Sequence, residues 1–146
     1  MCTAFVVLVR ITNAVVFQVI ADESCNPAFV AADLLSQAEH GVDSQVVLVS
    51  SSLSDDILKE IEKEIDKQAH ALPRVDIVRE SVSRSLIIKV SGPEEALQFS
   101  NAYAPEHLIL HLKDASFWVE HVRNAGSVFV GPYSPERLVP HQVVHW

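Results

Sequence analysis

Short apolar runs alternate along the chain with segments whose apolar residues recur every three or four positions. Runs rich in Val, Ile and Leu are typical of buried strands. They occur at residues 13–21, 45–49, 86–90, 107–112 and 127–130. Strands that alternate with helices predict βαβ units, and therefore an α/β fold with a mainly parallel open sheet and helices on both faces.

Helix-capping residues set the ends of the predicted helices. Asn26 is a good N-cap and Pro27 a good first helical residue, so the first helix should run to about His40. Ser54 caps a second helix that closes at Pro73. The apolar face of this second helix is formed by Leu58, Ile61, Ile65, Ala69 and Leu72. Two further helices are predicted, from Gly92-Pro93 to a point before Pro105 and from Ala115 to Arg123.

Length, charge and cysteine content restrict the functions that the chain can have. A chain of 146 residues suits a single α/β domain over residues 1–146. The formal net charge of -8 disfavours nucleic acid and anionic membranes, so a small molecule or a protein is the expected partner. Cys2 and Cys25 form no disulfide framework and match no zinc motif, which favours a reducing compartment and a cytoplasmic protein.

The first twenty residues, MCTAFVVLVRITNAVVFQVI, are long enough and apolar enough to suggest a membrane anchor. Arg10, Thr12, Asn13 and Gln18 interrupt this stretch, and neither a basic segment nor a small-residue cleavage site frames it. Its Val and Ile content favours one or two buried strands over a targeting or membrane segment.

One face of the first predicted helix is polar, although most of the helix is apolar. The stretch DLLSQAEHG places Asp33, Ser36, Gln37 and His40 three and four residues apart on one helix face, and Gly41 ends the helix. This stripe is either a solvated helix face or half of a binding site. The imidazole of His40 suits zinc, but the amide oxygen of Gln37 is an uncommon zinc ligand, so the spacing alone favours the solvated face.

The expected topology brings a second polar pair to the same edge of the sheet. In a βαβ unit the helix runs antiparallel to its strands, so Gln37 and His40 should lie where the strands begin. Glu106 and His107 start a predicted strand on that edge, directly after Pro105. These two groups can exchange protons, although a solvated turn is the plainer interpretation. Nucleotides usually bind at the opposite edge of open α/β sheets, and the sequence has no Gly-rich phosphate loop.

The remaining histidines within the predicted elements are expected to have structural roles. His111 shares a strand face with His107 and should be half-buried. His70 and His121 lie near predicted helix ends, where a cation is favourable.

Three sequence blocks carry a resemblance to a known enzyme family. The blocks are DLLSQAEHG, NAYAPEHL and NAGSVFVGPYSPE, and the similarity runs from about Val19 to Glu136. Together they closely resemble histidinol dehydrogenase. The resemblance implies an incomplete Rossmann-like domain from an NAD- and zinc-dependent oxidoreductase, which oxidises L-histidinol through L-histidinal to L-histidine in histidine biosynthesis. It also implies a homodimer.

The resemblance assigns roles to both polar pairs. It makes Gln37 and His40 zinc ligands that border the substrate, where zinc would hold the imidazole and amine of histidinol. It makes Glu106 and His107 the acid/base pair. His107, which also binds substrate, would take the alcohol proton while hydride leaves to NAD, and Glu106 would activate the water that attacks the aldehyde.

Both ends of the chain, residues 1–18 and 137–146, depart from the family pattern. The family's Gly-Pro-Ser-Glu turn, whose serine touches substrate, is replaced by Ala14-Val15-Val16-Phe17. The stretch RLVPHQVVHW offers no counterpart to the family's third and fourth zinc ligands, for which His141 and His145 are weak substitutes, and no NAD-binding region is recognisable. We therefore expect an incomplete and inactive piece of a histidinol dehydrogenase. The alternative is a non-catalytic α/β module that binds a partner.

Overall fold

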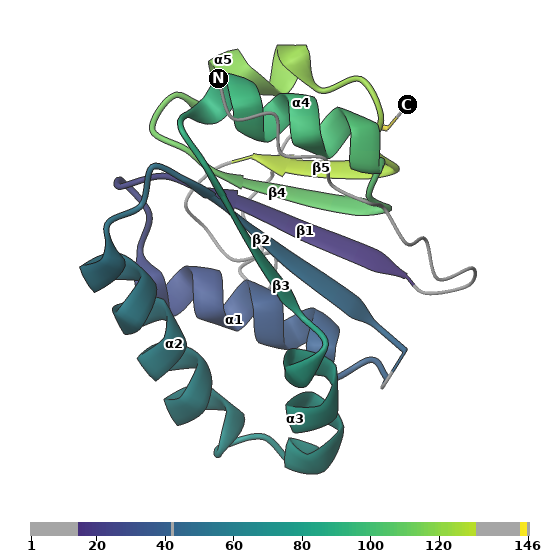
Figure 1. The fold of residues 1–146 in the computed structure, drawn as a ribbon. Helices are drawn as coiled ribbons and strands as arrows, with labels where there is room; N and C mark the ends of the chain where they lie inside the picture. Colours follow the sequence, from purple (N-terminus) through teal and green to yellow (C-terminus); the bar gives the residue numbers. More distant parts are fainter. Residues whose placement is uncertain (1–14, 42, 131–143, 146) are drawn as a thin grey trace.

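The computed structural model describes residues 15–41, 43–130 and 144–145. Its sheet has the strand order β3-β2-β1-β4-β5-β6 (Figure 1). The strands are β1 (Val16–Ala21), β2 (Gln45–Ser51), β3 (Leu86–Val90), β4 (His107–His111), β5 (Ser127–Val130) and β6 (Val144–His145). Strands β1 to β5 are parallel, and β6 pairs antiparallel with β5. The predicted mainly parallel sheet is confirmed.

Helices cover both faces of this sheet, as predicted (Figure 1). One face carries α1 (Pro27–Ala38), α2 (Asp55–Ala69) and α3 (Val75–Ser83), and the other carries α4 (Pro93–Tyr103) and α5 (Ala115–Trp118). A 3-10 turn, Val119–His121, follows α5. Because successive strand residues point to opposite faces, Val19 joins the core beneath α1 while Ile20 joins the core beneath α4.

Several element ends differ from the prediction, while β3 and β5 have the predicted bounds. α1 stops at Ala38, short of His40, and α2 stops at Ala69, so that Leu72 lies in the turn that follows. Pairing with its neighbours extends β2 beyond the predicted end, as far as Ser50 opposite Ala21 of β1 and Ser51 opposite Val90 of β3. Residues 13 and 14 of the first predicted strand lie outside the described residues.

α3 was not predicted from the sequence. It is a nine-residue helix whose buried side chains are only Val78 and Ser81. Val75, Val78 and Val82 have helical spacing, but the helix is short and no side chain caps its N-terminus, so its signal in the sequence is weak. The Ser81 hydroxyl donates a hydrogen bond to the carbonyl of Ser44 at 3.1 Å, which ties α3 to the turn before β2. The helix therefore depends on a contact with a distant part of the chain.

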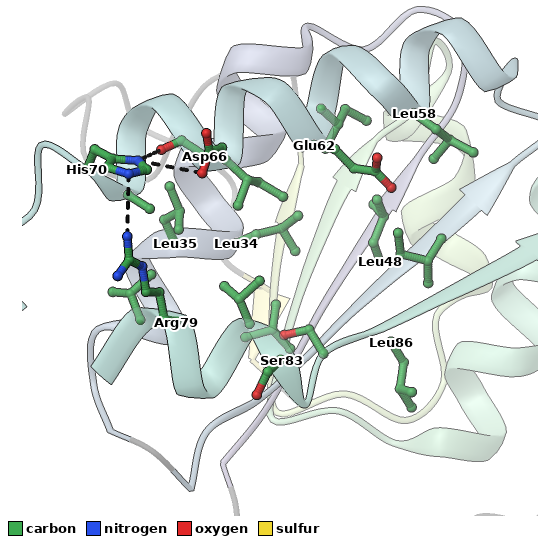
Figure 2. A pocket seen from close by; sticks show the side chains of 18 residues that line it. Leu34, Leu35, Leu48, Leu58, Glu62, Asp66, His70, Arg79, Ser83 and Leu86 are labelled. Carbon is green, nitrogen blue, oxygen red and sulfur yellow. Dashed lines mark hydrogen bonds and ion pairs between the residues drawn. The ribbon is translucent and has the colours of Figure 1, made fainter. Parts of the chain in front are cut away.

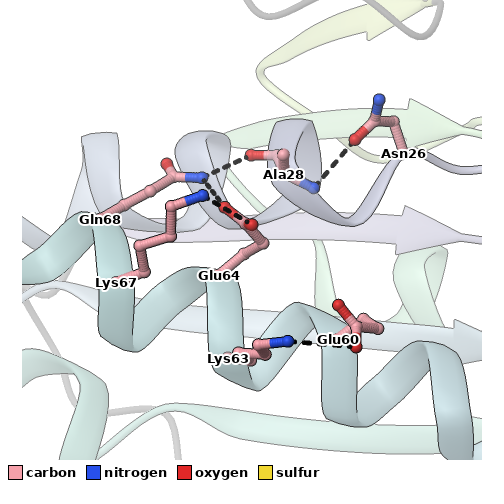
Figure 3. A network of polar contacts seen from close by, with 7 residues as sticks. All are labelled: Asn26, Ala28, Glu60, Lys63, Glu64, Lys67 and Gln68. Carbon is pink, nitrogen blue, oxygen red and sulfur yellow. Dashed lines mark hydrogen bonds and ion pairs between the residues drawn. The ribbon is translucent and has the colours of Figure 1, made fainter.

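Polar contacts join α2 to the first turn of α1 (Figure 3). The Gln68 side-chain amide donates to the carbonyl of Ala28 at 3.0 Å and to the Glu64 carboxylate at 3.1 Å. Lys67 also donates to Glu64, at 3.2 Å. Exposed ion pairs of this kind contribute little, so the apolar contact of the two helices, centred on the buried Ile61, supplies most of the stability there.

None of the helices in the described part of the chain combines the length and the apolar character needed to cross a membrane.

The N-cap of α1 can be tested directly. The Asn26 side chain accepts a hydrogen bond from the backbone N–H of Ala28 at 2.9 Å. Asn26→Ala removes this acceptor and should lower the free energy of unfolding by about 1 kcal/mol, the usual cost of a lost cap. Asn26→Ser keeps a capping oxygen and should remain within about 0.5 kcal/mol of the parent. Urea denaturation measures both, and equal losses would contradict the capping role.

Candidate functional site

The polar stripe on α1 passes from the core to the edge of the sheet. Asp33 is fully buried, Gln37 is 9% exposed, and His40, just beyond the end of the helix, is exposed. A solvated helix face would leave all three in water. Of the two interpretations left open by the sequence, the solvated face is therefore wrong for Asp33 and Gln37.

Gln37, His40 and His107 line one open hollow of about 400 Å³ at the edge where the parallel strands begin. The hollow is also lined by Val15, Gly41, Asp43 and Ser44. These residues come from the ends of α1 and from the starts of β1, β2 and β4. The expectation that the end of the first helix and the start of the 107–111 strand meet at this edge is therefore met.

The His107 imidazole is half-buried between two aromatic side chains. Its ring centroid lies 6.3 Å from that of Phe17 on β1 and 6.5 Å from that of Phe129 on β5. Aromatic side chains on both neighbouring strands, β1 and β5, therefore restrict the orientation of the His107 ring. The same side chain lines the hollow, so one side of the imidazole remains available to a small molecule.

Glu106 lies next to the hollow but does not line it. Its side chain is exposed, whereas its backbone is held on two sides. The Glu106 N–H donates to Val16 at 3.0 Å, and its carbonyl accepts from Ser127 at 2.8 Å. The backbone of this residue is therefore fixed between β1 and β5, while its carboxylate faces water.

A left-handed residue sets the path of the chain into this segment. Ala104 has φ 54° and ψ 65°, and its N–H donates to the Ser100 carbonyl at 2.8 Å to end α4. A side chain in this conformation is strained, and Gly is the usual choice. Pro105 follows and is buried, so the chain leaves the helix abruptly and enters β4 at His107.

His111 is buried, so the expectation of a half-buried side chain was wrong. It is 2% exposed, and its Nε2 lies 2.6 Å from Oδ2 of Asp33. The sequence offered two weak signals for this pair, namely the place of Asp33 on the polar stripe and the alternation of His111 with His107. Neither could show that a residue of α1 meets the end of β4, because that contact is set by tertiary packing.

The donor set at the hollow is suitable for part of a metal shell. It contains the imidazoles of His40 and His107, the amide of Gln37 and the carboxylate of Asp43. Nitrogen and oxygen donors of these types can bind zinc. In the described residues, however, no group of three or more His, Cys, Asp or Glu side chains is placed to hold a metal ion.

Cys25 does not add a ligand or nucleophile to the site. It follows β1, at the opposite edge of the sheet from the hollow. Burial, reinforced by the negative charges of Asp22 and Glu23, raises the pKa of its thiol to about 11. The thiolate, which is the reactive and metal-binding form, is therefore scarce at neutral pH.

Two hydrogen bonds join the loops at the opposite edge of the sheet, where open α/β sheets usually bind ligands in a crevice. In open α/β sheets this crevice lies where the strand order reverses, here between the carboxyl ends of β1 and β4. The Asp22 carboxylate accepts a hydrogen bond from the Lys113 N–H at 2.9 Å, and the Asp22 N–H donates to the His111 carbonyl at 3.1 Å. The two loops that would form a crevice are thereby joined.

A separate apolar cavity of about 480 Å³ lies between α1, α2, α3 and the strands β2 and β3 (Figure 2). At one end of the cavity, His70 Nδ1 lies 2.6 Å from the Asp66 carbonyl and Arg79 lies 3.5 Å from His70 Nε2, while Glu62 and Ser83 lie apart from this group. None of Gln37, His40, Glu106 and His107 lines it. The cavity is thus distinct from the candidate site.

Comparisons with known proteins agree on one family. The family model for histidinol dehydrogenase matches residues 14–141. The histidine biosynthesis trifunctional protein of Neurospora crassa is 58% identical over 120 residues, and the histidinol dehydrogenase of Schizosaccharomyces pombe is 52% identical over 117 residues. A crystal structure of histidinol dehydrogenase from Elizabethkingia anophelis is similar with a TM-score of 0.78 and 44% sequence identity.

These matches cover most of this chain but a small part of each relative. They include 82%, 80% and 83% of the chain for the Neurospora, Schizosaccharomyces and Elizabethkingia proteins, respectively. The chain spans only 14%, 27% and 28% of the lengths of these proteins, in the same order.

Replacing Gly126 should disturb the backbone of Glu106. A Cβ at Gly126 would lie 2.6 Å from the Glu106 carbonyl oxygen. Gly126→Ala should therefore lower the free energy of unfolding by about 1–3 kcal/mol, the usual range for overpacking. Gly41→Ala is the matched control, since a Cβ there meets no atom within 4 Å. Its effect should stay within about 0.5 kcal/mol. Urea denaturation distinguishes the variants, and equal stabilities would refute the close contact.

Proposed function

Because this chain belongs to the histidinol dehydrogenase family, we propose that it carries half of that family's active site. In this proposal the substrate is L-histidinol, which is oxidised through L-histidinal to L-histidine with NAD. The single observation that supports it best is the hollow at the start of the strands, where Gln37 and His40 meet His107 although they lie far apart in the sequence.

Gln37 and His40 would hold the zinc ion. Gln37 is nearly buried, so its amide has few orientations, while the exposed His40 imidazole lies at the mouth of the same hollow. Bound zinc would hold the imidazole and amine of histidinol. In the family, two further ligands complete the shell.

His107 would act as the general base and also contact the substrate. Its ring is restrained between Phe17 and Phe129 and borders the hollow, so a substrate alcohol placed there lies beside the imidazole. Imidazole is suited to this step because its ordinary pKa is close to neutral pH. His107 would accept the alcohol proton as hydride leaves for NAD.

Glu106 would activate the water that attacks the aldehyde. Its carboxylate is exposed and in contact with solvent, while its backbone is fixed between β1 and β5. A fixed backbone with a hydrated side chain suits a group that must take a proton from water. The second oxidation would then follow from the hydrated aldehyde.

NAD would be held elsewhere in the complete enzyme. At the usual ligand crevice of this sheet, the contacts of Asp22 with Lys113 and His111 join the loops after β1 and β4. The family members matched here are several times longer than this chain, so they have further residues from which a cofactor site can be formed. We further propose a homodimer and a cytoplasmic location for the complete enzyme.

A non-catalytic partner-binding module is the second candidate function. It is favoured by two exposed apolar residues of β3, Leu86 at 45% and Ile87 at 47% exposure, at an edge of the sheet. An apolar strand edge is a ready surface for another polypeptide. Activity with histidinol separates the two candidates.

Zinc binding tests the proposed metal ligands. With two ligands from this chain, the free energy of zinc binding should fall well short of the about 10–16 kcal/mol of complete structural sites. His40→Ala should weaken binding further, whereas His121→Ala, which removes an exposed histidine outside the hollow, should not. Titration calorimetry measures each affinity. Tight stoichiometric binding that needs His40 but neither His141 nor His145 would show that the ligand count is wrong.

The isolated chain should not oxidise histidinol. Hydride transfer requires nicotinamide, alcohol and base in one geometry, and a displacement of about 1 Å can cost a hundredfold. His107 and Glu106 offer proton transfer, which contributes only about 10²–10⁴ in rate. The assay is NADH formation from histidinol and NAD with zinc present, compared with His107→Ala. Turnover that depends on His107 would mean that the family's other parts are dispensable.

A further inference from the structure

A buried hydrogen bond joins the two elements that carry the candidate site. Asp33 on α1 and His111 on β4 have side chains with no exposed area, and Oδ2 and Nε2 lie 2.6 Å apart. A ring N–H of histidine can donate such a hydrogen bond to a carboxylate oxygen. The short distance is typical of a charge-assisted hydrogen bond.

Stability does not explain why polar groups occupy this position. The other polar atoms of the pair, Asp33 Oδ1 and His111 Nδ1, are buried without a hydrogen-bond partner among the described residues. Removing such groups from water costs free energy that a single hydrogen bond repays poorly. Apolar side chains of similar size would pack here at equal or lower cost. A directional contact, unlike an apolar one, fixes how a helix is rotated against a sheet.

On the helix, the pair fixes the direction in which the candidate ligands point. Each helical residue advances by about 100°, so Gln37 is about 40° from Asp33 around the axis, and a continued helix would place His40 about 20° away on the other side. Holding Asp33 against the sheet therefore turns Gln37 and His40 toward the same strands. Their rising exposure along the stripe agrees with this rotation.

Along the sheet, the pair also aligns the two halves of the hollow. His111 and His107 point to the same face of β4, about 13 Å apart at a rise of 3.3 Å per residue. α1 runs antiparallel to β4, and His40 lies about 10 Å from Asp33 in that direction at 1.5 Å per residue. Contact at Asp33 and His111 thus brings His40 nearly level with His107.

We propose that Asp33 and His111 are positioning residues, which set the rotation and axial placement of α1 so that Gln37 and His40 face His107. The consequence for zinc and histidinol rests on the proposed function, but the geometric role does not. The pair touches neither zinc nor substrate in this account, and it acts through the placement of α1.

The decisive variant is the double substitution Asp33→Leu with His111→Leu. Replacing a buried ion pair with apolar side chains of similar volume is often neutral or stabilising. If the double variant is folded but the geometry at the end of α1 is lost, that loss reports the positioning role and not a loss of stability. Hydrogen exchange of the Glu39 and His40 amides, which donate to the Leu35 and Gln37 carbonyls at the end of α1, reports that geometry. We expect exchange there to be about tenfold faster than in the parent, the scale of one lost hydrogen bond to a charged group.

Two further variants complete the test. His111→Gln retains a side-chain N–H for Asp33 and should restore slow exchange, which also keeps the test informative if the double variant does not fold. Ile61→Val, a buried change on α2 facing the same core, should leave exchange at Glu39 and His40 unaltered after correction for global stability. Parental exchange rates in the folded double variant, or fast exchange in His111→Gln, would overturn the proposal.

Zinc affinity separates this inference from the proposed function. If the parent chain binds zinc through Gln37 and His40, the double variant should bind it several-fold more weakly and His111→Gln should not. If the parent binds no zinc, the proposed ligand role fails, while the exchange rates still decide whether Asp33 and His111 position α1.

Discussion

The antiparallel placement of α1 against the parallel strands is the constraint on which the candidate site depends. Right-handed crossovers leave a helix between parallel strands one favourable packing direction. Burial of Val30 and Leu34 against Val19 of β1 holds α1 in that direction. Its last turn is consequently carried to the edge where β1, β2 and β4 begin, and the residues from opposite parts of the chain share one hollow there.

Local signals were sufficient for most of the fold. The runs of β-branched residues predicted β3 and β5 with their observed bounds, and Asn26-Pro27 predicted the start of α1. Because helix direction follows from the order of strands and helices, the sequence also predicted which edge would hold His40 and His107. These features depend on local sequence patterns and on the right-handedness of βαβ connections, and both can be applied to a single sequence.

Features that depend on tertiary contacts were not accessible in the same way. α3 buries only Val78 and Ser81, and its polar link to Ser44 crosses a large separation in sequence. The burial of His111 required knowledge that Asp33 lies opposite it. Likewise, the sequence predicted that Glu106 and His107 lie together at the start of a strand. It could not show that the Glu106 side chain faces solvent rather than the hollow. The catalytic and metal roles came from family resemblance, since Gln-x-x-His alone favoured a solvated face.

The two edges of the sheet differ in the chemistry that they can support. At the edge where strands begin, two imidazoles, an amide and the Asp43 carboxylate line the hollow. At the other edge, Asp22 joins the loops after β1 and β4, and its negative charge is unfavourable for a dinucleotide's pyrophosphate. The hollow therefore presents groups that can exchange protons, whereas the far edge presents a carboxylate. Hydride transfer needs acceptor and base in one geometry, so a hydride acceptor bound at the far edge, a full strand length from His107, would be too distant for chemistry at the hollow.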